Sequence, residues 1–433
     1  MFLRRARWVT DKYILLMMGV FPLFVGFRLH AYTAITRAKF LFFVIATGVW
    51  LVSVAALLLI GAARGERYPI TIRPAHIAMA AFLAFGAISA AFSEYGAVCL
   101  IGADRYDGYL STVLYGAIFF GVSLLAEPRP RYAWALGASA AVCSGIVLLQ
   151  LYGLDPFRLY PEGTNYYDKY ALLNSAFLGT LGNAGVTSAY LCLAAPILVI
   201  YPVLSEEQRD GWLLLPGAMA LAALALCDVD AGVVAAAGCA LVSVPMAIRN
   251  RRISRIAGAA AGGCAAAGLA ALYFWPGTSG TLWEMSQVLH GRLSDSFGSS
   301  RGQIWKQGWT LFLEKPWLGG GPGTTSLRFD IRWTRYVEEI GRERVAKVSN
   351  AHNVYLGYLL NIGLLGTLSY LAAAVCSFVT WARRRALGAL YPALGAALVC
   401  YMIQDFFGLG LCLSEPMLFV IWGLLESGQP SGE

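Results

Sequence analysis

Residues 351–381 read AHNVYLGYLLNIGLLGTLSYLAAAVCSFVTW, in which a short polar start leads into an apolar run. From residue 353 onward the run has no Lys, Arg, Asp or Glu, and it exceeds the roughly 20 residues needed to cross ~30 Å of hydrocarbon. Similar runs recur along the 433 residues, of which 58% are hydrophobic and 13% charged. Soluble domains average about 25% charged residues. The sequence therefore predicts an all-α, polytopic transmembrane bundle without a separate soluble domain.

The hydrophobic runs predict twelve spans. The first run follows Arg4, Arg5, Arg7 and Lys12 as a secretory signal would, but no cleavage site of small residues follows it, so we expect an uncleaved span. Residues 1–275 would then hold nine spans, residues 276–352 a long loop, and residues 353–433 three spans and a tail. The predicted spans are residues 13–32, 40–62, 74–93, 109–126, 132–153, 184–204, 211–227, 231–248, 255–275, 353–381, 386–404 and 408–426.

The distribution of basic residues predicts the orientation. With the N-terminus in the cytoplasm, 17 of the 33 Lys and Arg residues fall in inside loops and six in short outside loops. The other ten fall in the loop of residues 276–352, and a loop of this length is translocated largely regardless of its charge. We therefore expect both termini in the cytoplasm and the long loop outside a cytoplasmic (inner) membrane. The formal net charge of +8 follows from this placement and does not indicate a nucleic-acid partner.

The long loop carries a cation, a helix and a glycine turn. It contains SSRGQIWKQGWTLFLEKPWLGGGPG at residues 299–323, and the spacing of its apolar residues predicts a helix over residues 302–314. Pro316 would end this helix, because proline disfavours helix at the residue before it. Gly319 to Gly323, with Gly321 at the centre, then predict a turn whose backbone N–H groups are free to bind an anion.

Arginines recur in the second half of the loop. Their spacing predicts a second helix over residues 327–347, with Arg328, Arg332 and Arg335 near one face together with Arg342. This face either binds an anionic substrate or is solvated and paired with nearby glutamates (Glu338 and Glu339).

A second outside loop, residues 153–182, is rich in tyrosine. Its tyrosines (Tyr160, Tyr166, Tyr167 and Tyr170) are typical of an aromatic belt at the membrane interface, and they are equally suited to stack on sugars.

His352 is one of only four histidines and lies where the long loop enters the tenth span. Imidazole is the side chain whose ordinary pKa suits proton abstraction near neutral pH. Arg301, upstream in the same loop, offers a guanidinium that binds phosphate with two parallel hydrogen bonds.

This ordered set resembles the O-antigen ligase and polysaccharide polymerase superfamily. His352-Asn353, nine further residues, and then Gly363 to Thr367 are similar to its signature. Upstream motifs resemble it as well: Arg301, Ile304, Trp305, Pro316, Leu318-Gly319, Gly321, Gly179 to Asn183, and Pro196. The family moves glycan from an isoprenoid diphosphate carrier to an acceptor hydroxyl on the outer face of the membrane.

The resemblance implies a membrane glycosyltransferase, either a ligase or a polymerase of surface polysaccharide, with an undecaprenyl-diphosphate-type donor. Its partners would be a lipid-linked glycan donor, a glycan or lipid acceptor and the bilayer. It implies His352 as the base and Arg301 as the group that binds the diphosphate, in a site built partly from the long loop. Further substrate-binding candidates are Arg105, Asn353, Arg328, Arg332, Arg335 and Gly321. The carrier diphosphate is already an activated leaving group, so we expect no nucleotide, cofactor or metal.

One feature departs from the family. Many members carry Ser-Arg at the outer junction of the seventh and eighth spans, where this chain has Asp228-Val229-Asp230. Arg105 or the arginines of residues 328–342 would then supply the missing cation. The two aspartates orient a cation, bind a divalent metal or cap the helix.

Three polar residues near the last two spans (Gln404, Asp405 and Glu415) are predicted to line a polar cavity, because ionisable groups within a span are costly elsewhere. The alternative to the enzyme is a twelve-span transporter or flippase of lipid-linked sugars. Transporters commonly bind substrate at mid-membrane, whereas the polar groups here gather at the outer edge.

Overall fold

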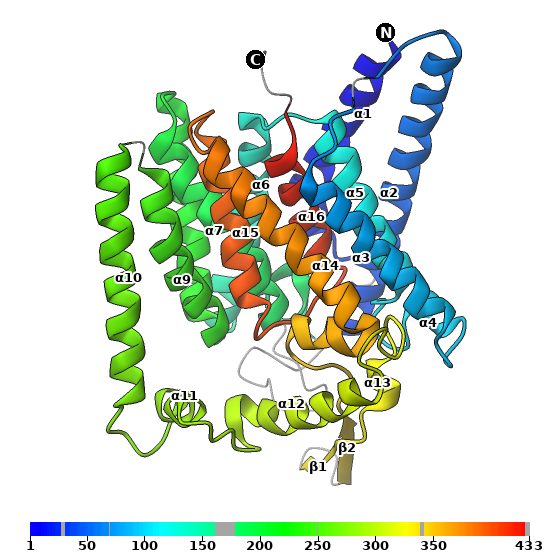
Figure 1. The fold of residues 1–433 in the computed structure, drawn as a ribbon. Coiled ribbons are helices and arrows are strands. Elements are labelled where there is room, and N and C mark those ends of the chain that lie inside the picture. The colour runs from blue at the N-terminus through cyan, green and yellow to red at the C-terminus, as the bar shows by residue number, and fades with distance from the viewer. Residues whose placement is uncertain (27–30, 69, 161–177, 249, 338–341, 429–433) are drawn as a thin grey trace.

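The computed structural model describes the chain except residues 27–30, 69, 161–177, 249, 338–341 and 429–433, and omits some side chains of the strands. Long helices run between the two ends of a bundle, and shorter elements lie across one end (Figure 1). The helices and strands are α1 (Phe2–Leu15, prolonged by short turns to Leu23), α2 (Ala31–Ala63), α3 (Pro74–Ala91), α4 (Val98–Ile101), α5 (Tyr109–Leu125), α6 (Pro130–Leu151), α7 (Ala184–Leu204), α8 (Leu214–Leu226), α9 (Asp230–Ala247), α10 (Arg251–Tyr273), α11 (Thr281–Leu289), α12 (Phe297–Glu314), α13 (Thr325–Arg328), β1 (Arg332–Val337), β2 (Arg342–Lys347), α14 (Val354–Arg384), α15 (Leu390–Gln404) and α16 (Glu415–Glu426).

In the described part of the chain, eight helices are long and apolar enough to cross a membrane. They are α2, α3, α6, α7, α8 with the turn before it, α9, α10 and α14. The other predicted spans overlap shorter helices, namely α1, α5, α15 and α16. The prediction of an all-α polytopic bundle is therefore confirmed, and the number of spans stays a prediction.

The boundaries of the first two predicted spans are wrong. A loop was expected between residues 32 and 40, but α2 begins at Ala31 and includes Lys39, which is fully buried. Its Nζ donates hydrogen bonds to the carbonyl oxygens of Phe21 and Pro22, at 2.7 and 2.9 Å. These carbonyls end the first helix and compensate the cost of burying a charge, so hydropathy alone misplaced the residue.

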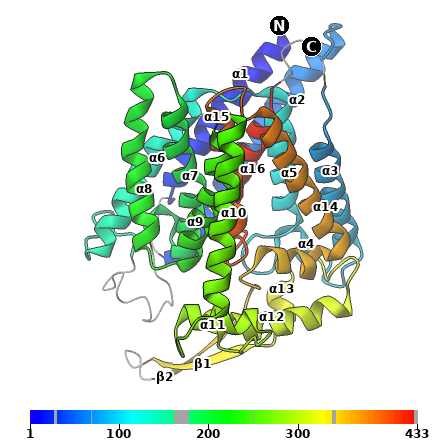
Figure 2. The same ribbon diagram turned by 60° about the vertical axis from the view of Figure 1, so that its left-hand side comes forward.

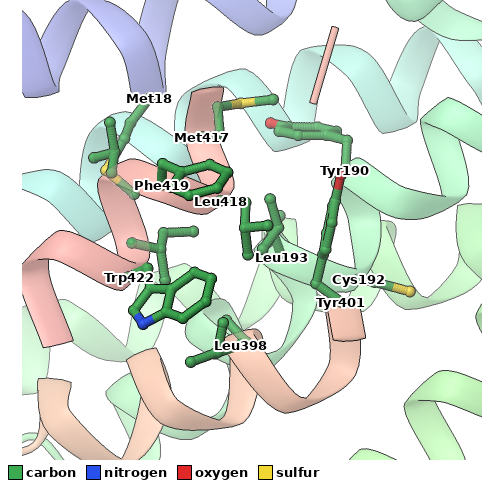
Figure 3. Packing of buried hydrophobic residues seen from close by; sticks show 14 of the residues in the cluster. Met18, Tyr190, Cys192, Leu193, Leu398, Tyr401, Met417, Leu418, Phe419 and Trp422 are labelled. Atoms are coloured by element: carbon green, nitrogen blue, oxygen red, sulfur yellow. The ribbon is translucent and has the colours of Figure 1, made fainter. Parts of the chain in front are cut away.

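The centre of the bundle is packed by α7, α15 and α16, as Figure 3 shows for Tyr190, Tyr401 and Trp422. Their polar atoms are satisfied inside the core. Trp422 Nε1 donates to Ser377 Oγ at 2.7 Å, and the hydroxyl groups of Tyr190 and Tyr401 hydrogen-bond those of two serines (Ser139 and Ser414). Buried aromatic groups with such partners contribute apolar area without leaving an unpaired dipole.

The loop of residues 276–352 covers one end of the bundle, where α11 and α12 lie across the helices (Figures 1 and 2). The helix predicted over residues 302–314 is confirmed as part of α12, which ends at Glu314, two residues before Pro316. The second predicted helix is wrong, because β1 pairs antiparallel with β2, with Thr334 opposite Val345. The prediction relied on the spacing of the arginines and neglected the β-branched and aromatic residues of these segments, which favour extended backbone.

Several predicted features lie outside the residues that the structure describes. The side chain of Arg335 and the residues Glu338 and Glu339 lie outside the described residues, as do Tyr166, Tyr167 and Tyr170 of the other loop. Arg328 ends α13 and Arg332 begins β1, so the arginines do not share one helix face.

Candidate functional site

His352 lies between β2 and α14, with Asn350 before it and Asn353 after it. Asn353 is the N-cap of α14, and its Oδ1 accepts a hydrogen bond from the backbone N–H of Leu356 at 2.9 Å. The backbone N–H of His352 donates to Asn350 Oδ1 at 3.1 Å. His352 itself has a φ of 47°, which is uncommon for a residue other than glycine, although histidine adopts it more often than most.

His352 lines a cavity with an empty volume of about 660 Å³, including the part open to solvent. More than half of its lining residues have a polar or charged side chain. Besides His352, the lining includes Arg105, Asp107, Thr112, Tyr115, Thr325, Asn350, Asn353, Tyr358, Asn361 and Glu415. Two residues that the sequence singled out as substrate-binding, Arg105 and Asn353, thus meet His352 in one hollow.

Arg105 reaches the cavity from the segment between α4 and α5. Its Nε donates to Ser349 Oγ at 3.0 Å and its Nη1 to the hydroxyl of Tyr32 at 3.2 Å. Its ion pair is with Asp104, at 3.7 Å. Asp107 also lines the cavity, and burial raises the pKa of its carboxyl.

Arg301 lies in α12 and lines a neighbouring cavity, not that of His352. Its Nη2 donates to the carbonyl of Phe407 at 3.3 Å and its Nη1 to that of Gly298 at 3.4 Å. Its Nε is buried and has no hydrogen-bond partner among the described residues. Burial lowers the pKa of Arg301, and the charge of Asp230, which is at the start of α9 and lines the same cavity, partly offsets this effect. Asp230, one of the two aspartates found where many family members have Ser-Arg, therefore acts on the charge of Arg301.

The segment before His352 is attached to α12. Trp305, one turn after Arg301, donates from Nε1 to the carbonyl of Ala351 at 3.0 Å. Burial is the largest cause that lowers the pKa of His352, to about 3, and the charges of Arg301 and then Arg105 lower it further. The imidazole is thus neutral at pH 7, and both arginines lie close enough to act on it.

Three glycines of the turn have no free amide. The N–H groups of Gly319, Gly320 and Gly321 donate to the carbonyls of Lys315, Leu360 and Asn361 at 2.8–2.9 Å. The prediction of an anion-binding turn is therefore wrong for these three glycines. Two of the accepting carbonyls belong to α14, which is broken at Gly363, where φ is 69° and ψ is −172°.

Hydrogen bonds between the loop and α14 run in both directions at this break. The N–H of Leu364, just after the break, donates back to the carbonyl of Pro316 at 2.8 Å. The backbone groups that a continuous helix would pair internally are thus paired with the loop. This explains why a glycine turn in the loop and a glycine in the tenth span occur together in the motif.

Arg328 secures the same junction. Its Nη1 donates to the carbonyl of Leu360 at 2.7 Å and its Nη2 to that of Leu311 in α12 at 3.2 Å. It does not belong to the described lining of the His352 cavity. These contacts join α12, α13 and α14, so the observed role of Arg328 is structural.

Glu415 lines the cavity, as its position at the outer end of the last span predicted. It is 1% exposed, and neither carboxyl oxygen has a hydrogen-bond partner among the described residues. The carboxyl oxygens of Asp405 are equally buried and unpartnered, but Asp405 is not part of the lining. The floor of the cavity thus has hydrogen-bonding capacity that the protein itself does not use.

The sequence reasoning missed Asn361 and Tyr358 of α14. Asn361 Oδ1 accepts from the hydroxyl of Thr325 at 2.8 Å, so the amide faces the loop junction and the cavity. The available signal was the presence of an amide two residues before Gly363 in an otherwise apolar span.

An apolar groove lies beside the site, between α9, α14 and α15. Tyr355, three residues after His352, is at one end of its lining, and Val375, Phe378 and Trp381 continue along α14. Nearly all of its surface is apolar, and its empty volume is about 1090 Å³ including the part open to solvent. Such a groove suits a hydrocarbon chain.

The comparison with protein families agrees with these observations. Residues 215–371 match the model of the O-antigen ligase family. The matched range includes α12, the glycine turn, His352 and the break of α14, and nothing in it supports a transporter. No curated protein matches the chain. Over residues 215–371, this multi-pass membrane protein is therefore similar to the O-antigen ligase family.

Proposed function

We propose that this protein transfers glycan from an undecaprenyl-diphosphate-type carrier to an acceptor hydroxyl, within the cavity lined by His352. The observation that carries the proposal is the meeting of a neutral imidazole with two guanidinium groups: Arg105 on the same cavity, and Arg301 close enough to lower the imidazole pKa. The product would be a ligated or polymerised surface glycan.

In this reaction His352 takes the proton of the acceptor hydroxyl as its oxygen attacks the anomeric carbon. The new carbon–oxygen bond forms as the bond to the diphosphate breaks, and the diphosphate leaves with the electron pair. Arg105 and Arg301 stabilise the charge that develops on the leaving group, since guanidinium groups remain charged and match phosphate geometry. The outcome at the anomeric carbon is inversion.

The donor itself would strengthen the base. In the free protein the two arginines lower the pKa of His352. A bound diphosphate brings negative charge to these arginines and offsets their effect, so the imidazole becomes more basic when the donor is in place. Proton abstraction is thereby coupled to donor binding.

The surroundings of the cavity support both parts of the donor. The apolar groove that begins at Tyr355 accommodates the isoprenoid chain, and the amide and carboxyl groups of Asn353, Asn361 and Glu415 suit sugar hydroxyls. We place the cavity outside the cell, with both termini cytoplasmic, because of the distribution of basic residues. Binding of substrate by Arg332 and Arg335 stays a prediction.

The test is transfer by the purified protein in proteoliposomes, supplied with a lipid-diphosphate-linked glycan and an acceptor. His352→Ala should lower the rate of covalent product formation by roughly 10²–10⁴-fold, which is typical for the loss of a general base. The matched control is His290→Ala, because His290 lies in the same loop but stacks on Tyr273 outside the cavity. Undiminished activity of His352→Ala would refute the proposal.

Arg301→Ala is the second arm of this experiment, with Arg292→Ala as its control, because Arg292 is exposed and lies in the same loop. We expect the loss in Arg301→Ala to appear mainly in kcat, since the leaving-group charge is greatest in the transition state.

A further inference from the structure

A second polar cavity lies at the opposite end of the bundle, at which α1 begins (Figure 1). It is formed by the first turns of α1, the end of α5 and the start of α6, and its empty volume is about 790 Å³ including the part open to solvent. Its lining consists of Arg4, Arg7, Trp8, Asp11, Lys12, Leu125, Ala126, Glu127, Arg129, Arg131 and Tyr132. The proposed transfer reaction does not use this cavity.

The cavity has an excess of positive charge. Five of its lining residues are basic and two are acidic. Asp11 is buried, forms an ion pair with Arg131 and accepts a hydrogen bond from the hydroxyl of Tyr132 at 2.7 Å. Glu127 is paired with Arg129 at 3.8 Å.

Three cations of this cavity remain without an acidic partner among the described residues. Arg4 and Arg7 are exposed and form no ion pair there, and Lys12 lies over the ring of Trp8, with its Nζ 5.6 Å from the ring centroid. An anion that enters the cavity therefore meets cations that need not first break an internal ion pair.

The residues around the cavity are typical of the level of the lipid headgroups at a membrane surface. Trp8 is 62% exposed, and exposed tryptophan at the end of a membrane helix is typical of the interface between hydrocarbon and water. Seven residues of the lining are charged, and Leu125 and Ala126 end the apolar helix α5 beside them. A ligand with an anionic head and an apolar body matches this arrangement.

We propose that this cavity binds the phosphodiester headgroup of an anionic phospholipid such as phosphatidylglycerol. Arginine side chains donate paired hydrogen bonds to phosphate oxygens, and basic pockets at the ends of membrane helices attract anionic lipid heads. The acyl chains would lie along α1 and α5. This inference does not depend on the proposed transfer reaction.

The experiment is native mass spectrometry of the full-length protein in detergent, titrated with dioleoylphosphatidylglycerol or dioleoylphosphatidylcholine. The variant Arg4→Gln/Arg7→Gln removes two unpaired cations and leaves the buried pair of Asp11 and Arg131 intact. We expect phosphatidylglycerol to bind about 30-fold more weakly to this variant, from the effect of two basic residues near a membrane surface. Binding of phosphatidylcholine should not change.

The control is Arg251→Gln/Arg252→Gln, which removes the same charge from exposed positions at the start of α10, at the same end of the bundle (Figure 1). Its phosphatidylglycerol affinity should change by less than about threefold, since these residues do not line the cavity. Equal loss in both variants would show attraction by surface charge alone and overturn the proposal. Displacement of the lipid by millimolar inorganic phosphate would assign the cavity to a soluble anion and overturn the proposal that its ligand is a phospholipid.

Discussion

At the scale of single residues, the chemistry of His352 is set by groups from distant parts of the chain. Arg105 comes from the segment between α4 and α5, Arg301 from α12, and Asn350 from the end of the loop. Burial and the two positive charges keep the imidazole neutral. A histidine that is neutral but weakly basic suits a base that should act only when an anionic donor is bound.

This environment predicts an unusual pH dependence. Because kcat/KM reports the ionisation of the free protein and the pKa of His352 is lowered to about 3, kcat/KM should stay level from about pH 8 down to about pH 5. A fall with an apparent pKa near the ordinary histidine value of about 6.5 would contradict it. The measurement is the initial rate at subsaturating donor across this range.

Substitution of Arg105 and of Arg301 tests whether their charges lower the pKa of His352. Arg105→Gln and Arg301→Gln each remove a positive charge that lowers the pKa of His352, so each should raise that pKa. The acid limb of the kcat/KM profile should then move to higher pH in both variants. A profile that moves to lower pH, or does not move, would show that these charges do not act on the base.

At the scale of elements, the site depends on a broken helix. The break of α14 at Gly363 exposes carbonyls that the glycine turn pairs, and this docks α12 and the loop against the span that begins beside His352. The motif thus encodes a junction between the loop and a membrane helix.

Gly363→Ala should therefore destabilise the protein. The backbone at Gly363 is in a region essentially restricted to glycine, which costs of the order of 1–3 kcal/mol for other residues. An added Cβ would also lie 2.3 Å from the carbonyl carbon and oxygen of Trp317. We expect a clear drop in the midpoint of thermal unfolding in detergent. Gly357→Ala, in the same helix with no atom within 4 Å of its added Cβ, should leave the midpoint unchanged or raise it.

The apolar groove gives a second test at this scale. Val375→Trp would fill part of the groove between α9, α14 and α15, so it should raise KM for a long-chain carrier more than for a short-chain analogue. Leu368→Trp is the control, because Leu368 is exposed on the same helix but does not line the groove. If both variants affect both carriers equally, the groove does not hold the lipid chain.

At the scale of the whole molecule, the bundle has two chemically different ends. The His352 cavity and α12 lie at one end, and the basic cavity of α1 lies at the other, where α16 also ends (Figures 1 and 2). Which of these ends faces the cytoplasm stays a prediction from the basic residues.

Cysteine labelling tests that orientation. In a Cys264→Ser background, which removes the exposed thiol, Thr278→Cys before α11 should react with a membrane-impermeant maleimide in intact spheroplasts. Glu206→Cys, exposed between α7 and α8 at the other end, should react only after permeabilisation. The opposite pattern would place the proposed active site in the cytoplasm.

Particular residues show how far the sequence was sufficient. His352, Arg301 and Asn353 stand out because a lone imidazole, a cation and a cap residue are rare beside an apolar run, and α12 follows from its apolar spacing. Lys39 and the strands β1 and β2 were misassigned, since a window along the chain does not register a carbonyl contributed by another helix or the pairing of two segments.

The sequence by itself determined that this is a helical membrane protein with a long loop before the tenth predicted span, because hydrocarbon imposes length and apolarity on every segment that crosses it. It also showed the resemblance to the O-antigen ligase family, through motifs whose residues are local in the chain. Only the tertiary structure decided that Arg105 and Glu415 share a cavity with His352. It also decided that the glycine turn donates hydrogen bonds to carbonyls before the break in α14, and that the N-terminal arginines line a second cavity. These arrangements depend on contacts between helices distant in sequence, where packing and hydrogen-bond pairing, and not hydropathy, select the neighbours.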